Sequence, residues 1–411
     1  MNPKRWLKKP VKWVVEAQRF RAYTRPSPPA ELGKPLRVAV CDLIPNLGDT
    51  VMLFPLLDAI ADENPGAEIV CFTQGIAREL RLHPAVTRVY EFRRQNALLK
   101  RLKYFGYVLE LRQWWKRELQ QERFHKVVCL RGGHDPFHSG YVAYMLGGTV
   151  RAGYDPALEP ERFDGSYLND AELLTHIVGE MHGVHEIERG WEVLQLAGLV
   201  QAPLQLGRVV RSLAAIAERP DVVEFRAKHI PREQPYAVIA PGASFPRRAW
   251  PAERFADLVR REVLPQGMLP VLLGGPELRD VCEAIGHSAG ARFLNLAGNT
   301  TFADLIAICS GASLFLGNDS GIGHIAGACG VPSLIVTAYA ASGSPSHHAS
   351  PWRSHPAGPR FAIAQPDTQR PPCTDECLAL EPHCILDVSV DDAQRVLHAM
   401  LRHDPATMRP R

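Results

Sequence analysis

The sequence has no long hydrophobic run and no strong excess of either charge. Among its 411 residues no stretch of about 18 consecutive apolar residues occurs, so we expect no membrane-spanning helix. The basic N-terminus is not followed by an apolar core and a small-residue cleavage site, so we expect no secretory signal. The balance of 47 basic against 44 acidic residues leaves a net charge of +3, which is too small to indicate a nucleic-acid partner.

Two further absences narrow the class of protein. No predicted strand is followed by a G-x-G-x-x-G turn with a ribose-binding acid about twenty residues later, which argues against a dinucleotide dehydrogenase. The nine cysteines are scattered over a long chain with no expected signal, so we expect free thiols and a cytoplasmic protein. A composition of 46% hydrophobic and 22% charged residues is typical of a globular protein, and the length favours two or more domains.

The N-terminal segment 1–35 is strongly basic. Residues 4–26 hold eight Lys and Arg residues against the single acid Glu16, with apolar and aromatic residues between them. As a helix this segment has a cationic and an apolar face, which predicts peripheral contact with the cytoplasmic face of a membrane. A basic leader that docks on its own domain explains the same pattern, and both interpretations stay open.

Short apolar runs alternate with helical patterns twice along the chain, which predicts two α/β domains with parallel, doubly wound sheets facing a central cleft. We place an N-terminal domain at 36–205, a linker at 206–234, a C-terminal domain at 235–388, and a final helix and tail at 389–411. The helix at 390–402 is expected to pack across the first domain. The strand-like runs are 36–41, 67–74, 86–92 and 125–131 in the first domain, and 236–244, 268–276, 291–298, 312–319 and 331–338 in the second.

The segment 311–332, GASLFLGNDSGIGHIAGACGVP, carries the clearest functional signal. An apolar strand runs into Asp319, Ser320 and Gly321, where a small-residue helix begins. The free N–H groups of a first helical turn and the helix dipole attract a phosphate, and His324 lies one turn further on. The alternative is an ordinary turn in which Asp319 or Ser320 caps the helix and His324 is a core histidine.

Other turns of the second domain carry polar residues suited to a nucleotide. Ser244 follows one strand and Arg248 precedes a helix that opens with Trp-Pro, which suits a diphosphate, although a solvated arginine loop gives the same pattern. Glu277 follows two glycines, where its carboxylate can accept hydrogen bonds from both ribose hydroxyls. The alternative is an acid at a helix N-terminus with no ligand. Thr300 can contact a base edge, although Thr300 or Thr301 also fits a helix cap.

Asp49 follows the first strand in PNLGDTVMLFP. A carboxylate at a domain cleft is a candidate general base, able to take a proton from an attacking hydroxyl. An aspartate at this position also fits a helix N-cap, and the residue alone does not decide between the two roles.

Taken in order, the motifs LGD, HEIERGWEVLQLAG, PGAS with RRAWP, LLGGPE, LAGNTTFADL and NDSGIGHIAGACGVP resemble glycosyltransferase family 9, the heptosyltransferases of lipopolysaccharide synthesis. The resemblance covers about residues 36–400. It implies a GT-B fold, a nucleoside-diphosphate sugar on the C-terminal domain and an acceptor on the N-terminal domain.

The resemblance also implies a role for each matching residue. Asp49 corresponds to the catalytic base, and Glu277 and Thr300 to ribose and nucleobase contacts. Arg248 stands where characterised heptosyltransferases carry a Lys, which leaves its role in stabilising the leaving group open. The diphosphate contacts are Ser244, Arg248, Asp319, Ser320, Gly321 and His324.

From this resemblance we expect an inverting, metal-independent glycosyltransferase that needs no cofactor. The first choice of donor is ADP-heptose, and lipopolysaccharide core, another glycan or a protein side chain can be the acceptor. Two alternatives stay open: a nucleotide-sugar epimerase of the same architecture, and a non-catalytic sugar-nucleotide-binding protein at the membrane. The nucleotide, the sugar and the oligomeric state are not predicted.

Cys373, Cys377 and Cys384 lie in PPCTDECLALEPHCIL, which resembles a cysteine-bearing segment common near the end of this family. With His383 they could complete a four-ligand metal site, yet their spacing is not that of a familiar zinc knuckle. We therefore predict a reduced, thiol-lined packing cluster rather than a metal site.

Overall fold

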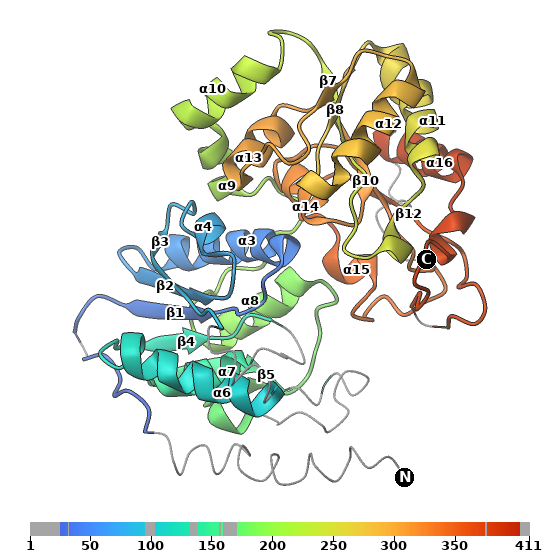
Figure 1. Ribbon diagram of the computed structural model, residues 1–411. Coiled ribbons are helices and arrows are strands. Elements are labelled where there is room, and N and C mark those ends of the chain that lie inside the picture. Colours follow the sequence, from blue (N-terminus) through green and yellow to red (C-terminus); the bar gives the residue numbers. More distant parts are fainter. Residues whose placement is uncertain are drawn as a thin grey trace. The chain divides into compact units, whose positions relative to one another are not determined.

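A computed structural model describes residues 25–31, 33–94, 103–131, 138–155, 158, 171–374 and 376–402 (Figure 1). Most of the predicted basic N-terminal extension lies outside these residues. The chain divides into two compact units. The first comprises Met1–Asn46 and Pro55–Leu204, and the second comprises Leu47–Phe54 and Gln205–Arg411.

The first unit contains a six-stranded parallel sheet with the order β3-β2-β1-β4-β5-β6. Its strands are β1 (Arg37–Cys41), β2 (Glu68–Thr73), β3 (Val86–Glu91), β4 (Lys126–Val128), β5 (Val150–Tyr154) and β6 (His176–Val178). Its main helices are α3 (Leu47–Glu63), α4 (Ala77–Leu80), α6 (Lys103–Trp114), α7 (Ser139–Leu146) and α8 (Glu186–Leu196).

Helices cover both faces of this sheet (Figure 1). Ala39 and Cys41 of β1 share one buried cluster with residues of α6 and α7. On the other face α8 packs against α3, where an added Cβ at Gly190 would lie 2.4 Å from Leu56 Cδ1. A strand buried on both sides needs apolar residues at successive positions, which explains the uninterrupted runs in the sequence.

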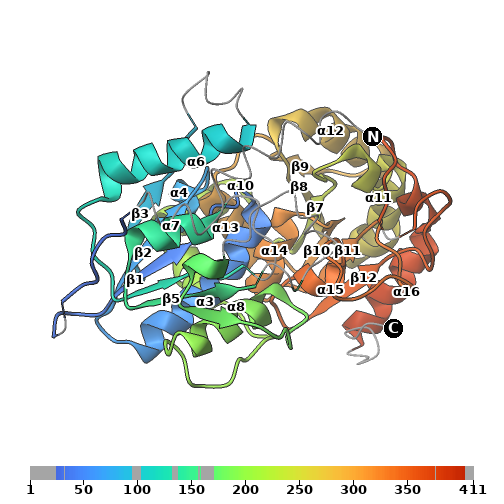
Figure 2. The ribbon, with the colours of Figure 1, turned by 90° about the horizontal axis from the view of Figure 1, so that it is seen from below.

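The second unit contains a second six-stranded parallel sheet, with the order β12-β11-β10-β7-β8-β9 (Figure 2). Its strands are β7 (Tyr236–Ala240), β8 (Leu269–Leu272), β9 (Leu294–Asn295), β10 (Leu314–Asn318), β11 (Ser333–Val336) and β12 (Phe361–Ala364). Its α-helices are α9 (Arg211–Ala217), α10 (Pro220–His229), α11 (Ala252–Leu258), α12 (Arg279–Ala289), α13 (Phe302–Ser310), α14 (Gly321–Ala328), α15 (Pro351–Ser354) and α16 (Val390–Leu401).

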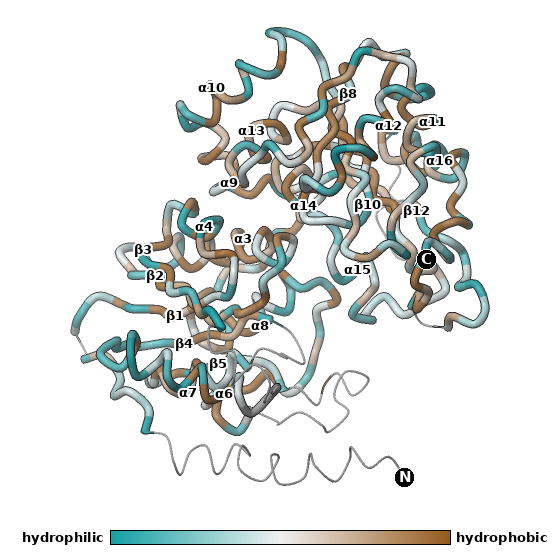
Figure 3. The backbone as a smooth tube through the Cα atoms, in the orientation of Figure 1, coloured by the Kyte–Doolittle hydropathy of each residue, from teal (hydrophilic) through white to brown (hydrophobic). Residues whose placement is uncertain are grey.

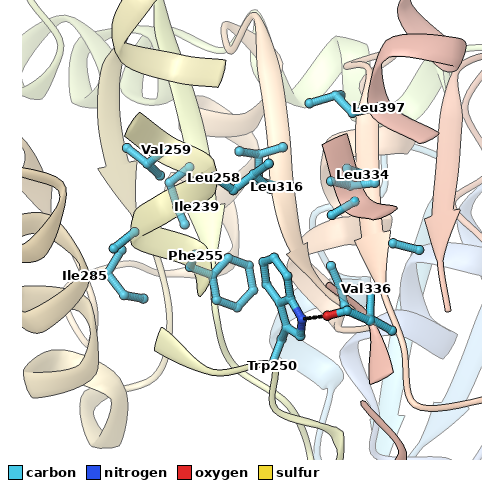
Figure 4. Packing of buried hydrophobic residues seen from close by; sticks show 14 of the residues in the cluster. Ile239, Trp250, Phe255, Leu258, Val259, Ile285, Leu316, Leu334, Val336 and Leu397 are labelled. Atoms are coloured by element: carbon cyan, nitrogen blue, oxygen red, sulfur yellow. Dashed lines mark hydrogen bonds between the residues drawn. The ribbon is translucent and has the colours of Figure 1, made fainter. Parts of the chain in front are cut away.

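The core of the second unit lies between its sheet and the helices α11, α12 and α16. Trp250 is fully enclosed here (Figure 4): its ring meets Phe255 edge to face at 4.9 Å, and its Nε1 donates to the Val388 carbonyl at 2.8 Å. The partner for the indole N–H allows this large side chain to be buried without an unpaired donor. Hydrophobic residues follow the strands of this sheet, whereas α10 is largely hydrophilic (Figure 3).

The predicted α/β class with two doubly wound parallel sheets is confirmed. One packing prediction is wrong: α16 does not cross the first domain, because Leu397 and Met400 are buried against Leu334 and Ala362 of its own unit. The predicted linker contains α9 and α10. Among the described residues no helix is long and apolar enough to cross a membrane.

Candidate active site

In each sheet the strand order reverses direction once, between β1 and β4 in the first sheet and between β7 and β10 in the second. In the second sheet β7 lies beside β10, the chain moves outward from β7 to β8 on one side, and it moves outward from β10 to β11 on the other. Ligands of open α/β sheets bind beyond the carboxyl ends of the strands at such a reversal. The turns after β7 and β10 carry the predicted diphosphate residues, so the topology gathers them at this point.

The start of α14 presents polar atoms that lack protein partners. Ser320 is the N-cap in an extended conformation (φ −154°, ψ 162°), yet its side chain makes no cap hydrogen bond. Its Oγ is buried and has no hydrogen-bond partner among the described residues, and the same holds for Nδ1 of His324. Buried polar atoms are normally paired, so these two atoms indicate a place for a ligand. The adjoining free N–H groups favour an anionic one.

Asn318 holds the surrounding loops together, a role that we did not predict. Its side chain is fully buried, its Nδ2 donates to the Pro241 carbonyl at 2.6 Å, and its Oδ1 accepts from the Trp250 backbone N–H at 3.1 Å. One residue at the end of β10 thus fixes both ends of the loop that carries Ser244 and Arg248. The NDSG motif was visible in the sequence, but these long-range partners were not.

Ser244 and Arg248 lie on this loop after β7. Ser244 is exposed, and Arg248 ends a short 3₁₀ turn over Pro246–Arg248. The Arg248 guanidinium lies 5.7 Å from the centre of the Phe245 ring, and its Nη2 lies 4.0 Å from a carboxylate oxygen of Glu376. This pair is a third exposed and weak, so the guanidinium can turn to a stronger anion such as a diphosphate.

The predicted nucleoside contacts lie on two touching turns. Glu277 is exposed, and its carboxylate folds back over Gly275, where an added Cβ would lie 2.3 Å from Oε1. The Gly298 N–H donates to the Gly274 carbonyl at 2.9 Å, which joins the turn before Thr300 to the turn before Glu277. The helix cap of α13 is Thr301, which shares a capping box with Asp304. Thr300 is therefore not the cap.

The first turn of α3 belongs to the second unit and packs against the start of α14. An added Cβ at Gly48 would lie 2.9 Å from Cδ2 of His324, and an added Cβ at Gly321 would lie 2.7 Å from Cβ of Leu47. The N-cap of α3 is Asn46, so Asp49 is not the cap but lies within the first helical turn, half-buried. Asp49 and the diphosphate candidates therefore share one compact unit.

Burial of His324 favours the neutral form of its imidazole. Burial lowers the pKa of His324, and the nearby carboxylates of Asp319 and Asp49 oppose this effect without reversing it. A neutral imidazole keeps one N–H for a ligand oxygen, and an incoming phosphate would favour the charged form. The carboxylates of Asp49 and Asp319 therefore lie near enough to His324 to act on its pKa. The individual roles of the site residues remain predictions.

The two parallel, doubly wound sheets define an α/β protein of the GT-B class, and solved structures agree on the fold. The chain matches Escherichia coli ADP-heptose LPS heptosyltransferase II with a TM-score of 0.61 and 16% identity, over 90% of this chain and 99% of that one. It matches E. coli heptosyltransferase WaaC with ADP with a TM-score of 0.62 and 16% identity, over 88% of this chain and 99% of that one.

Sequence comparison identifies the family. Residues 112–376, more than half of the chain, match the model of glycosyltransferase family 9 (heptosyltransferase). Lipooligosaccharide heptosyltransferase 2 of Haemophilus influenzae is 24% identical over 248 residues, which is 51% of this chain and 68% of that protein. The chain belongs to glycosyltransferase family 9, and the protein is a glycosyltransferase.

Proposed function

We propose that the protein transfers a heptose from ADP-heptose to a hydroxyl of a lipopolysaccharide-core acceptor with inversion at the anomeric carbon. The relatives support this choice, because all those compared above are heptosyltransferases, two are named for lipooligosaccharide or LPS, and one is described with ADP. The observation that carries the proposal is the packing of α3 on α14, which joins a candidate base to a candidate diphosphate site in one unit.

The donor lies along the carboxyl ends of β7, β8 and β10 in this proposal. Glu277 accepts the ribose hydroxyls and Thr300 contacts the base. The diphosphate receives hydrogen bonds from the N–H groups at the start of α14, from the Ser320 hydroxyl and from His324, and Ser244 and Arg248 approach from the β7 loop. The unpartnered Oγ of Ser320 and Nδ1 of His324 support this placement.

Asp49 acts as the general base. Its carboxylate takes the proton of the acceptor hydroxyl as that oxygen forms a bond to the anomeric carbon, and the bond from that carbon to the β-phosphate oxygen breaks. The bonding electrons leave with ADP, on the face opposite to the attacking oxygen, so the configuration inverts. Negative charge grows on the phosphate as the bond breaks, where Arg248, His324 and the helix start stabilise it.

The transfer step in this proposal needs no metal ion. A helix N-terminus and a guanidinium supply the positive field that a divalent cation supplies in other nucleotide-sugar enzymes, and the imidazole of His324 adds a hydrogen-bond donor. We place the enzyme in the cytoplasm, where its basic N-terminal extension contacts the inner membrane that carries the acceptor.

Calorimetric titration with ADP, UDP and GDP, followed by transfer assays, tests the proposal. We expect ADP to bind at least about tenfold tighter than UDP or GDP, because a base-specific pocket leaves polar groups unpaired with the wrong base. Incubation with ADP-heptose and a heptose-deficient core acceptor should add one heptose by mass spectrometry. Isomerised donor without an acceptor would indicate an epimerase, and binding without any turnover would indicate a non-catalytic protein.

A further inference from the structure

A cluster of three cysteines and a histidine lies in the second unit, apart from the residues proposed to act on the donor. The Sγ atoms of Cys373, Cys377 and Cys384 and a ring nitrogen of His383 all lie within 4.8 Å of one another. The three cysteines are buried and His383 is half-buried. Sequence spacing favoured a packing cluster, but the fold brings all four ligand atoms to one point.

The distances fit a tetrahedral metal ion. With zinc–sulfur bonds of about 2.3 Å and zinc–nitrogen bonds of about 2.0 Å, tetrahedral angles separate sulfur and nitrogen ligands by about 3.5 Å. Nδ1 of His383 lies 3.3 Å from the sulfur of Cys384 and 3.7 Å from that of Cys373. Nδ1 therefore points at the sulfur atoms, which suits a shared ion.

Apolar packing alone does not explain this segment. Between Cys377 and His383 the chain exposes Leu378 and Leu380, which are 70% and 84% accessible. A loop held by the hydrophobic effect would turn its leucines inward, whereas this loop turns its sulfur atoms and imidazole inward. Backbone N–H groups of Leu378 and Ala379 also approach the Cys373 sulfur.

We propose that Cys373, Cys377, His383 and Cys384 bind one zinc ion that cross-links residues 373–384. Three thiolates and one imidazole with no open position form a structural zinc site. The bound ion would fix the segment that follows, whose carbonyls accept from the core: Leu386 from Nη1 of Arg254 at 2.9 Å, and Val388 from the Trp250 indole at 2.8 Å. This site lies outside the proposed transfer chemistry and does not depend on it.

Metal analysis of the purified full-length protein tests the proposal. The protein is produced in medium that supplies zinc, iron and cobalt and is purified with a reductant but without chelator. We expect about one zinc per chain, and at least about fivefold less in Cys377→Ser and His383→Asn, because each removes one of four ligands. Cys329→Ser, which removes a thiol of the same unit outside the cluster, should retain the full zinc content.

Two measurements on the unaltered chain keep the test valid if a variant fails to fold. Replacement of zinc by Co²⁺ should give strong visible bands typical of tetrahedral cobalt together with thiolate-to-cobalt charge transfer. A thiol reagent should release zinc as the cluster is modified. Three results would overturn the proposal. The first is protein that contains no metal and also fails to take up Co²⁺, the second is bound iron in place of zinc, and the third is a disulfide between two of the cluster cysteines.

Discussion

Gly48 of α3 lies against the imidazole of His324, so close that an added Cβ would be 2.9 Å from Cδ2 and 3.1 Å from Nε2. Both residues belong to the second unit. A glycine at this position lets the first turn of α3, which carries Asp49, approach the start of α14. The absence of a side chain at position 48 therefore explains how a candidate base and a candidate diphosphate ligand come to share one site.

Gly48→Ala tests this relationship. Alanine favours a helix over glycine, so without the contact the substitution would raise the thermal stability. The methyl group instead collides with a buried ring, and we expect destabilisation of about 1–3 kcal/mol and at least about a tenfold loss of kcat. Gly179→Ala, a non-helical position in the first unit where an added Cβ meets nothing within 4 Å, is a control for glycine replacement without a collision. Unchanged melting temperature and kcat in Gly48→Ala would contradict the packing.

His324 should couple ADP binding to proton uptake. Burial lowers the pKa of His324 in the free protein, and a bound diphosphate favours its charged form. Affinity for ADP should therefore increase as the pH falls from about 8 to about 6. Calorimetry in buffers of different ionisation enthalpy measures the uptake. Because ADP itself titrates in this range, the difference from His324→Gln is the informative quantity, and an identical pH profile in that variant would exclude the coupling.

The same histidine should make the fold less stable in acid. Its folded-state pKa lies below the unfolded value of about 6.5, so the unfolded chain binds more protons below that pH. Its contribution to stability is present above about pH 6.5 and is lost as the pH falls through the folded pKa, by at most about 1.4 kcal/mol per pH unit. Denaturant unfolding at a series of pH values below about 6.5 gives the free energy of unfolding at each pH. That free energy should fall less steeply with decreasing pH in His324→Gln than in the unaltered protein.

Glu277 should contribute to nucleoside binding but not to diphosphate binding. Glu277→Ala removes the proposed acceptor of the ribose hydroxyls, and we expect ADP to bind about tenfold to a hundredfold more weakly, as for charged hydrogen bonds of about 1.5–3 kcal/mol. Competition by inorganic pyrophosphate should be unchanged. Glu253→Ala, which removes an exposed acid from α11 of the same unit, is the control. Equal losses for ADP and pyrophosphate would place Glu277 elsewhere.

Glu376 should compete with the donor for Arg248. The two side chains lie 4.0 Å apart and are partly exposed, so their attraction is weak. Glu376→Gln frees the guanidinium, and we expect ADP to bind about twofold to fivefold tighter, within the range of a surface ion pair. The gain should disappear in the double variant with Arg248→Ala. Tighter binding that persists without Arg248 would mean that Glu376 acts by general repulsion.

The sequence made the local features of this protein predictable. Asp319, Ser320 and His324 lie within six residues of one another, and strand-to-helix periodicity places them at a helix start. Strands β5, β6 and β12 escaped prediction. A charged residue and a glycine interrupt the apolar run of β5, Arg151 and Gly153, and β6 has only three residues, none of them buried.

Contacts between distant parts of the chain could not be predicted in the same way. The bridge from Asn318 to Trp250, the approach of Gly48 to His324 and the meeting of His383 with Cys373 all depend on how the chain returns upon itself. Residue spacing does not encode these distances. The cysteine spacing did not indicate that four possible ligand atoms lie close together, because unfamiliar intervals along the chain can still meet in space.

The most direct test of the central claim compares Asp49→Asn with the unaltered enzyme in both transfer and binding. Asparagine preserves the size of the side chain but cannot accept the acceptor's proton, so we predict that kcat falls by about 10²- to 10⁴-fold. The Kd for ADP should stay within about threefold, because Asp49 contacts the acceptor rather than the nucleotide. Transfer by Asp49→Asn at a rate close to that of the unaltered enzyme would contradict the account.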